Sequence, residues 1–150
     1  MNLSKLTSSS EHGIIMLTGG DGVRVIGKID IEMLRGISSN ILENEVVLMD
    51  ERKEHIKAQR GNDFLSMYMP FFVDILNDPD VIFKDSKNLH TALVCKRMVA
   101  VTGKVVCIVL KLAVKGDNPN YKNSIITAHE LNDRQFAKYL RNKKIVYQKG

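Results

Sequence analysis

A change in the spacing of apolar residues near residue 80 constrains the fold of this chain most strongly. Before it, apolar side chains recur at helical spacing over residues 31–42 and 64–76, the second stretch being kinked or ended at Pro70. After it, short runs rich in β-branched residues predict strands. These runs cover residues 81–83, 91–101, 105–114, 124–129 and 145–147. Helices followed by strands predict an α+β fold, with N-terminal helices packed on a roughly four-stranded antiparallel sheet.

Capping residues predict the limits of two further helices. Asp50 is a typical N-cap and Gly61 a typical C-terminal stop, so the charged stretch between them should be helical. Asn132 or Asp133 can begin a late helix that runs to about Arg141. A short buried strand is expected immediately before Asp50.

The length of 150 residues favours one domain. Residues 1–28, which are rich in serine and glycine, are predicted to be an appendage or linker, and residues 29–150 the domain. The apolar runs are too short for a membrane span. We expect a soluble chain, either whole or cut from a larger secreted protein.

The two cysteines are expected to be buried free thiols. A hairpin turning at residues 102–104 would place Cys95 opposite residues 110–111, away from Cys107, so a disulfide is not expected. No Cys/His cluster, Walker loop, dinucleotide fingerprint, HExxH or GxSxG motif is present. We therefore expect no metal and no cofactor.

The net charge of +5 favours a polyanionic partner. Cations concentrate in residues 134–150, which hold no acidic residue and include Tyr139 and Tyr147. Cations interleaved with aromatic rings suit phosphates and stacked bases. The alternative is a solvated helix face followed by a basic tail. The cations are Arg134, Lys138, Arg141, Lys143, Lys144 and Lys149.

His55 is the candidate for proton transfer. It lies in the charged helix with Arg52 and Gln59 on its face. A histidine can take and give a proton near neutral pH, as metal-free RNA cleavage requires. The alternative is a surface histidine without a role.

Polar residues within the strands are candidate phosphate contacts. In a regular strand Asn123 and Thr127 share one face and Ser124 lies on the other. A threonine hydroxyl can donate to a phosphoryl oxygen, although a polar strand face is commonly just solvent-exposed. Lys96 and Lys111 could reach an anion site or extend outward from the sheet.

Taken in order, several motifs resemble one nuclease superfamily. They are ERKEHI (51–56), NDPDVI (77–82), the Thr91 strand with Lys96, NPNYKNSIIT (118–127) and RNKKIVY (141–147). Over residues 28–149 this set resembles the phage-associated branch of the Barnase–EndoU–Colicin–RelE superfamily, found in phage proteins and polymorphic bacterial toxins.

The resemblance implies metal-independent RNA cleavage, often of tRNA, that leaves a 2′,3′-cyclic phosphate. The chain departs from the family pattern in having His90-Thr91 in place of an Asn-Thr pair, and no obvious second catalytic histidine. The implied catalytic residues are His55, Lys96, Thr127, Ser124 and Arg52. The implied substrate-binding residues are Asn123, Lys111, His90, Arg141, Lys143 and Lys144.

The expected function is therefore a toxin ribonuclease, delivered within a larger bacterial toxin or phage protein into a target-cell cytoplasm. An acidic immunity protein that covers the cleft is then implied as a partner. Two alternatives stay open. One is a non-catalytic RNA- or protein-binding module of a phage protein, and the other is a structural domain that meets packaged DNA.

Overall fold

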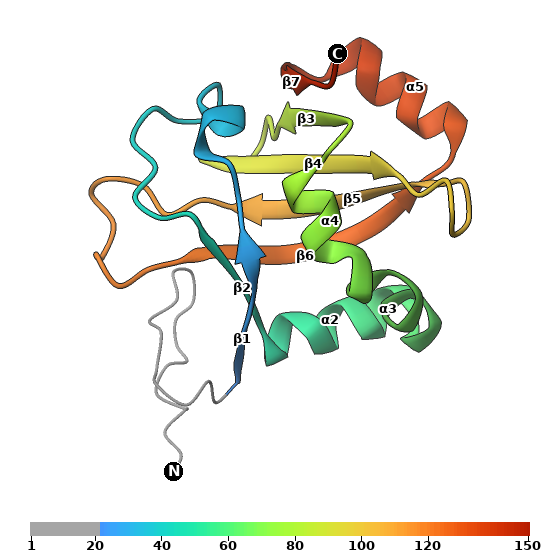
Figure 1. The fold of residues 1–150 in the computed structure, drawn as a ribbon, viewed down its shortest axis with the longest axis horizontal. Coiled ribbons are helices and arrows are strands. Elements are labelled where there is room, and N and C mark those ends of the chain that lie inside the picture. Colours follow the sequence, from blue (N-terminus) through green and yellow to red (C-terminus); the bar gives the residue numbers. More distant parts are fainter. Residues whose placement is uncertain (1–21) are drawn as a thin grey trace.

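A mixed sheet organises the molecule. The computed structural model describes residues 22–150, and within them seven strands lie in the order β1-β2-β6-β5-β4-β3-β7 (Figure 1). Neighbouring strands are antiparallel except β2 and β6, which are parallel. The strands are β1 (Val23–Lys28), β2 (Glu45–Met49), β3 (Val81–Lys84), β4 (Thr91–Arg97), β5 (Val105–Lys111), β6 (Asn123–Leu131) and β7 (Ile145–Gln148).

The prediction of a roughly four-stranded antiparallel sheet with N-terminal helices is therefore wrong. The sheet is wider because β1 and β2 form an antiparallel pair that joins it through the parallel β2–β6 pair, and because β7 adds beyond β3. Such pairings join segments far apart in the chain, and local apolar spacing does not encode them. Within the predicted appendage of residues 1–28, residues 23–28 form β1, and residues 1–21 lie outside the described residues.

The helices largely follow the capping signals. The prediction that Asp50 is an N-cap is wrong, because the helix begins at Asp50 itself with Met49 as its N-cap and no side-chain cap hydrogen bond. Pro70 separates α3 from α4 within a 3-10 turn, as predicted. Asn132 caps α5 through a capping box, in which Asn132 Oδ1 accepts from the Gln135 backbone N–H at 2.8 Å. The helices are α2 (Asp50–Arg60), α3 (Asn62–Tyr68), α4 (Phe72–Asn77) and α5 (Asp133–Asn142), with 3-10 turns η2 (Ile31–Leu34) and η3 (Met69–Phe71).

The predicted helix over residues 31–42 is shorter than expected, because only η2 forms there. Gly36 follows it and lies against β7. A Cβ atom at Gly36 would come within 2.7 Å of Val146 Cβ, so the close approach of these segments requires glycine.

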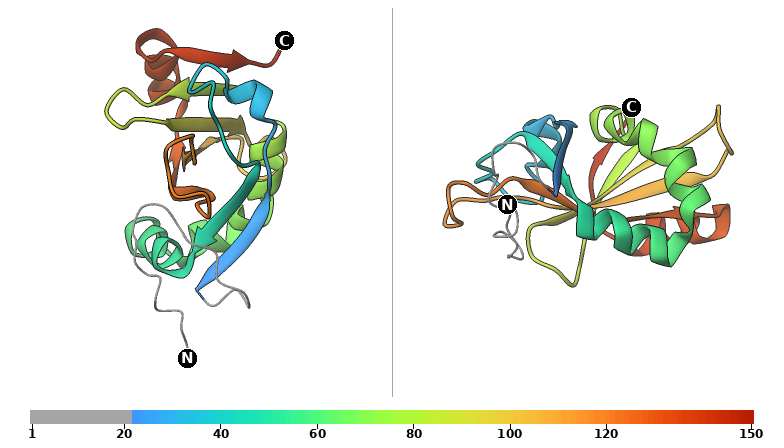
Figure 2. Two further views of the ribbon diagram at one scale, coloured as in Figure 1. Left: turned by 90° about the vertical axis from the view of Figure 1, so that its left-hand side faces the viewer. Right: turned by 90° about the horizontal axis from the view of Figure 1, so that it is seen from below.

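Helices cover both faces of the sheet. In the left-hand view of Figure 2, α4 and α5 lie on opposite sides of the strands. The face toward α3 and α4 packs Tyr68, Phe72 and Ile75 against a large apolar cluster. The face toward α5 carries a smaller cluster, against which Phe136 and Tyr139 pack.

α2 runs along β6 where β2 ends. β2 pairs with β6 only through Val46 with Asn123 and Val47 with Ser124. Farther along β6, Arg60 Nε of α2 donates to the Ala128 carbonyl oxygen at 3.0 Å. The chain thus passes directly from a paired strand into a helix that covers the next part of the same edge.

Cys95 and Cys107 form a disulfide, so the prediction of free thiols is wrong. β4 ends at Arg97, four residues earlier than the predicted strand, and residues 98–104 form a wide loop. In that loop the Met98 carbonyl oxygen accepts from the backbone N–H groups of Val101, Thr102 and Gly103. The wider loop changes the register, and Cys95 lies directly opposite Cys107.

Candidate functional site: a basic cleft beside α5

A cleft with a volume of about 920 Å³ lies between α5, the end of β6 and the segment after β3. Of the described residues, five cations line it, against one carboxylate, Glu130. A concave surface with this excess of positive charge attracts phosphate groups. The cations are Arg60, Lys84, Lys138, Lys143 and Lys144.

His129 lies in this cleft, on the sheet face that α5 covers. Burial lowers the pKa of its imidazole to about 4, and the positive charges of Arg60 and Lys143 lower it in the same direction. The ring is therefore neutral at physiological pH. Its Nε2 atom lies 3.4 Å from the Tyr139 hydroxyl oxygen.

Tyr139 is the residue of α5 that contacts the His129 imidazole. Its ring packs edge-on against Phe83, with 5.7 Å between the ring centroids, and Lys143 Nζ lies 4.7 Å from its ring centroid. Burial raises the pKa of the Tyr139 hydroxyl, and the negative charge of Asp85 adds to the shift. The hydroxyl therefore keeps its proton at neutral pH.

A bulge in β6 changes which polar residues share a face. Thr127 opposes Val109 and Ile125 opposes Leu110, so Ile126 is an extra residue in the pairing. Because of it, Ser124 and Thr127 lie on the same face of the sheet, and the expectation that they lie on opposite faces is wrong.

Polar residues continue this face beyond the cleft. Thr91, Lys111 and Ser124 lie side by side in one row across β4, β5 and β6. Thr127 lies in the next row, and His129 in the row after it. Among the described residues Thr127 Oγ1 is a buried atom without a hydrogen-bond partner, so its bonding capacity is unused.

His90 precedes this polar face at the start of β4. It has a positive φ of 55°, and its carbonyl oxygen accepts from the Leu112 backbone N–H. Within residues 22–150 its Nδ1 atom is also buried without a hydrogen-bond partner.

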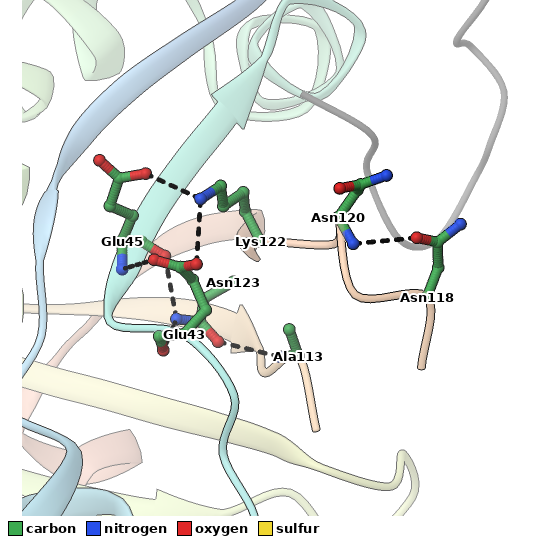
Figure 3. A network of polar contacts seen from close by, with 7 residues as sticks. All are labelled: Glu43, Glu45, Ala113, Asn118, Asn120, Lys122 and Asn123. Atoms are coloured by element: carbon green, nitrogen blue, oxygen red, sulfur yellow. Dashed lines mark hydrogen bonds and ion pairs between the residues drawn. The ribbon is translucent and has the colours of Figure 1, made fainter. Parts of the chain in front are cut away.

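Asn123 is occupied by the fold (Figure 3). Its Oδ1 accepts from the Ala113 N–H at 2.9 Å, and its Nδ2 donates to the carbonyl oxygens of Glu43 and Glu45 at 2.6 and 2.9 Å. Beside it, Lys122 Nζ pairs with the Glu43 and Glu45 carboxylates at 3.0 and 3.1 Å. Through these contacts Lys122 and Asn123 of the NPNYKN motif hold the start of β6 to the segment that leads into β2. We call this group of contacts the clamp.

Lys96 lies on the other face of the sheet from Cys95 and His129, since it alternates with Cys95 along β4. Its Nζ donates to the Asp78 carbonyl oxygen at 2.7 Å and pairs with the Asp78 carboxylate at 3.0 Å. Hydrogen bonds from Lys149 and then Lys96 lower the pKa of Asp78. Lys96 is thus part of an ion-pair group separate from the cleft.

The remaining predicted residues divide between the cleft and the outer surface. Lys143 and Lys144 line the cleft. His55 and Arg141 are exposed and Arg52 is half-buried, and none of them belongs to the described residues that line it. His129 is absent from the predicted site residues because no local motif surrounds it in the sequence. Its alternation with Thr127 on a polar strand was the available signal.

Within residues 22–150, no group of three or more His, Cys, Asp or Glu side chains could hold a metal ion. No helix in that range is long and apolar enough to cross a membrane.

Comparison with known proteins gives one family. The model of the phage MuF C-terminal domain matches residues 53–149, from the first half of α2 through β7. No curated protein and no solved structure matches the chain significantly. The matched stretch contains every described residue that lines the basic cleft. The chain therefore belongs to the phage MuF C-terminal domain family and is a phage-associated protein.

Proposed function

We propose that this chain is a metal-independent endoribonuclease that binds RNA in the basic cleft beside α5. The observation that carries the proposal is the gathering of five cations around a cleft that also holds the neutral imidazole of His129. In the proposed reaction the 2′-hydroxyl attacks the adjacent phosphate and leaves a 2′,3′-cyclic phosphate. The resemblance of the ordered motifs to a nuclease superfamily supports the same chemistry.

The cleft offers what this reaction needs. Lysine and arginine side chains bind the backbone phosphates and stabilise the charge that grows on the phosphate in the transition state. Tyr139 presents an aromatic ring at the cleft, beside which a base can stack. Lys111, Ser124 and Thr127 are proposed as phosphate contacts on the continuing sheet face.

The test is incubation of the purified chain with total cellular RNA in EDTA, followed by sequencing of the new ends. We expect discrete cuts with 2′,3′-cyclic phosphate ends. An oligonucleotide that carries 2′-deoxyribose at the cut site is the control, since it can bind but cannot be cut. Intact RNA, or cleavage of the deoxy control, would overturn the proposal.

We also propose that the domain acts as a toxin in a target cell and is held inactive by an acidic immunity protein. The five cleft cations give such a protein a complementary surface, and covering the cleft would exclude RNA. Expression in a bacterial host should stop growth. Unimpaired growth with active enzyme in the lysate would contradict the toxin role.

A second candidate is an RNA-binding module without catalysis. It is favoured by the presence of a single histidine among the described residues that line the cleft, since cations and an aromatic ring suffice for binding alone. It predicts salt-sensitive RNA binding without cleavage. Equal binding to DNA without cleavage would favour a structural role beside packaged DNA.

A further inference from the structure

We propose that His129 accepts the proton of the attacking 2′-hydroxyl and that Tyr139 donates a proton to the departing 5′-oxygen. This inference rests on the ribonuclease function proposed above and assigns the two proton carriers that function requires. It moves the catalytic role from the helix that carries His55 to a pair of residues within the cleft.

The geometry of the pair supports these roles. Both side chains line the cleft, and His129 Nε2 lies 3.4 Å from the Tyr139 hydroxyl oxygen. When the Nε2 hydrogen points to this oxygen, Nδ1 carries the free lone pair and can accept a proton. The tyrosine hydrogen is then free to point to another acceptor. One contact thus orients a proton acceptor and a proton donor at the same time.

The proton balance closes within the pair. His129 takes the 2′-hydroxyl proton as the 2′-oxygen forms a bond to phosphorus and the bond from phosphorus to the 5′-oxygen breaks. Tyr139 gives its proton to the departing 5′-oxygen. The tyrosinate then regains a proton from Nε2 of the imidazolium through their contact, which leaves the imidazole hydrogen on Nδ1. Exchange of this hydrogen with water returns it to Nε2 and restores the starting tautomer.

Burial and the charges around the imidazole keep it unprotonated in the free protein, where it is a weak base. Arg60 of α2 and Lys143, which follows α5, oppose protonation of His129. The nearest neighbour on β5 is Cys107, which is in a disulfide and does not titrate. With a pKa of about 4, His129 is unprotonated throughout the physiological range. A bound phosphate would offset the two positive charges and strengthen the base.

His55 lacks this setting. It is exposed on α2 and is absent from the described residues that line the cleft. A proton carrier must reach the reacting atoms, so a residue beside the bound phosphates is the better candidate.

The first experiment compares three variants of the full chain with the wild type: His129→Gln, Tyr139→Phe and the matched control His55→Gln. We expect His129→Gln and Tyr139→Phe each to lower kcat/KM for RNA by about 100-fold or more. Their RNA Kd and melting temperature should stay close to the wild-type values. His55→Gln should cleave within about threefold of wild type.

The outcomes separate the two proposals. A folded His129→Gln variant that cleaves at the wild-type rate, beside an active wild type, overturns this inference and leaves the ribonuclease function standing. Loss of cleavage in His55→Gln but not in His129→Gln does the same. A wild type that binds RNA but never cuts it overturns both.

The second experiment measures kcat/KM for RNA as a function of pH. If His129 had only a structural role, its protonation would not set the acid limb of this profile. The wild-type kcat/KM should fall with decreasing pH only near pH 4, where His129 becomes protonated. Arg60→Gln removes a positive charge and should move this acid limb to higher pH. Arg60→Lys keeps the charge and should leave the limb in place. An acid limb that both Arg60 variants leave unchanged contradicts the role of His129.

Discussion

The two faces of the sheet differ in how completely they are filled. On the face toward α3 and α4, apolar side chains form one large cluster in which Tyr68, Phe72 and Ile75 are fully buried. On the other face the apolar layer lies beneath α5, and polar rows continue beyond it toward Ser124. The filled face supplies most of the folding stability, whereas the partly covered face leaves titratable groups in reach of a ligand.

The largest expected effect is the loss of stability in Phe72→Ala. Phe72 is 0% exposed in the filled face. Its truncation leaves a cavity, so we expect the free energy of unfolding to fall by about 3–5 kcal/mol in a urea titration. Phe136→Ala, on the half-buried layer beneath α5, should cost clearly less. Equal losses would show that the two faces contribute alike.

Reduction of the Cys95–Cys107 disulfide should have the next largest effect. The two cysteines are 12 residues apart in sequence and join β4 to β5 on the partly covered face. Constraint of the unfolded chain by such a loop contributes about 2–4 kcal/mol. Thermal unfolding should therefore occur at a lower temperature with reductant. The control is the double variant Cys95→Ala/Cys107→Ala, whose unfolding temperature should be the same with and without reductant. A wild-type unfolding temperature that reductant does not change would contradict the expectation.

Smaller effects are expected on RNA binding. Lys143→Gln and Lys144→Gln each remove a cation from the cleft. Each should lower the slope of log K against log salt concentration by about 1, without a change in folding. Lys149→Gln is the control, because Lys149 belongs to the same basic stretch but pairs with Asp78 at 2.9 Å. An equal effect of all three changes would assign binding to a diffuse basic tail.

The smallest expected effect concerns the clamp that holds the start of β6. Burial raises the pKa of Glu43, but hydrogen bonds from Lys122 and from backbone N–H groups outweigh it, and the net pKa is lowered. Glu43 therefore stabilises the fold above its ordinary pKa of 4.5, and this contribution is lost as pH falls through the lowered value.

Glu43→Gln should accordingly lower the free energy of unfolding by about 1 kcal/mol at pH 7. The difference in free energy of unfolding between this variant and the wild type should disappear as the pH falls through and below 4.5, the ordinary pKa of the carboxyl group. Denaturant titrations at several pH values measure it. Glu54→Gln, at an exposed pair 3.9 Å from Lys57, is the control and should change little. A gap that persists at low pH would exclude the carboxylate as its source.

Local structure could be predicted from the sequence where local residues determine it. The helix between Asp50 and Gly61, the interruption at Pro70 and the cap at Asn132 follow from short-range chemistry, and the structure contains all three. The sheet could not be predicted in the same way. The parallel contact of β2 with β6 joins Val46 to Asn123 across much of the chain. The position of the disulfide depends on a loop whose width is set by hydrogen bonds to Met98.

The candidate site shows the same limit. Lys143 and Lys144 were predicted from a basic stretch, and both line the cleft. His129 was missed because its partners, Arg60 and Tyr139, come from two other elements. Regular alternation along a strand predicts Ser124 and Thr127 on opposite faces. The single extra residue Ile126 shifts this alternation and brings them to the same face. A histidine between Ala128 and Glu130 carries no sign of the positive charges of Arg60 and Lys143 that lie near it after folding.

The pairing of β2 with β6 has a consequence for self-association. The family match begins at residue 53, after β2 and the first residues of α2. A chain shortened to that point would keep the whole cleft but lose the strand that pairs with Asn123 and Ser124. The backbone groups of β6 would then be open to a strand from another molecule. β1 and β2 thus keep this edge of β6 paired, and a chain without them should aggregate more readily than the full chain.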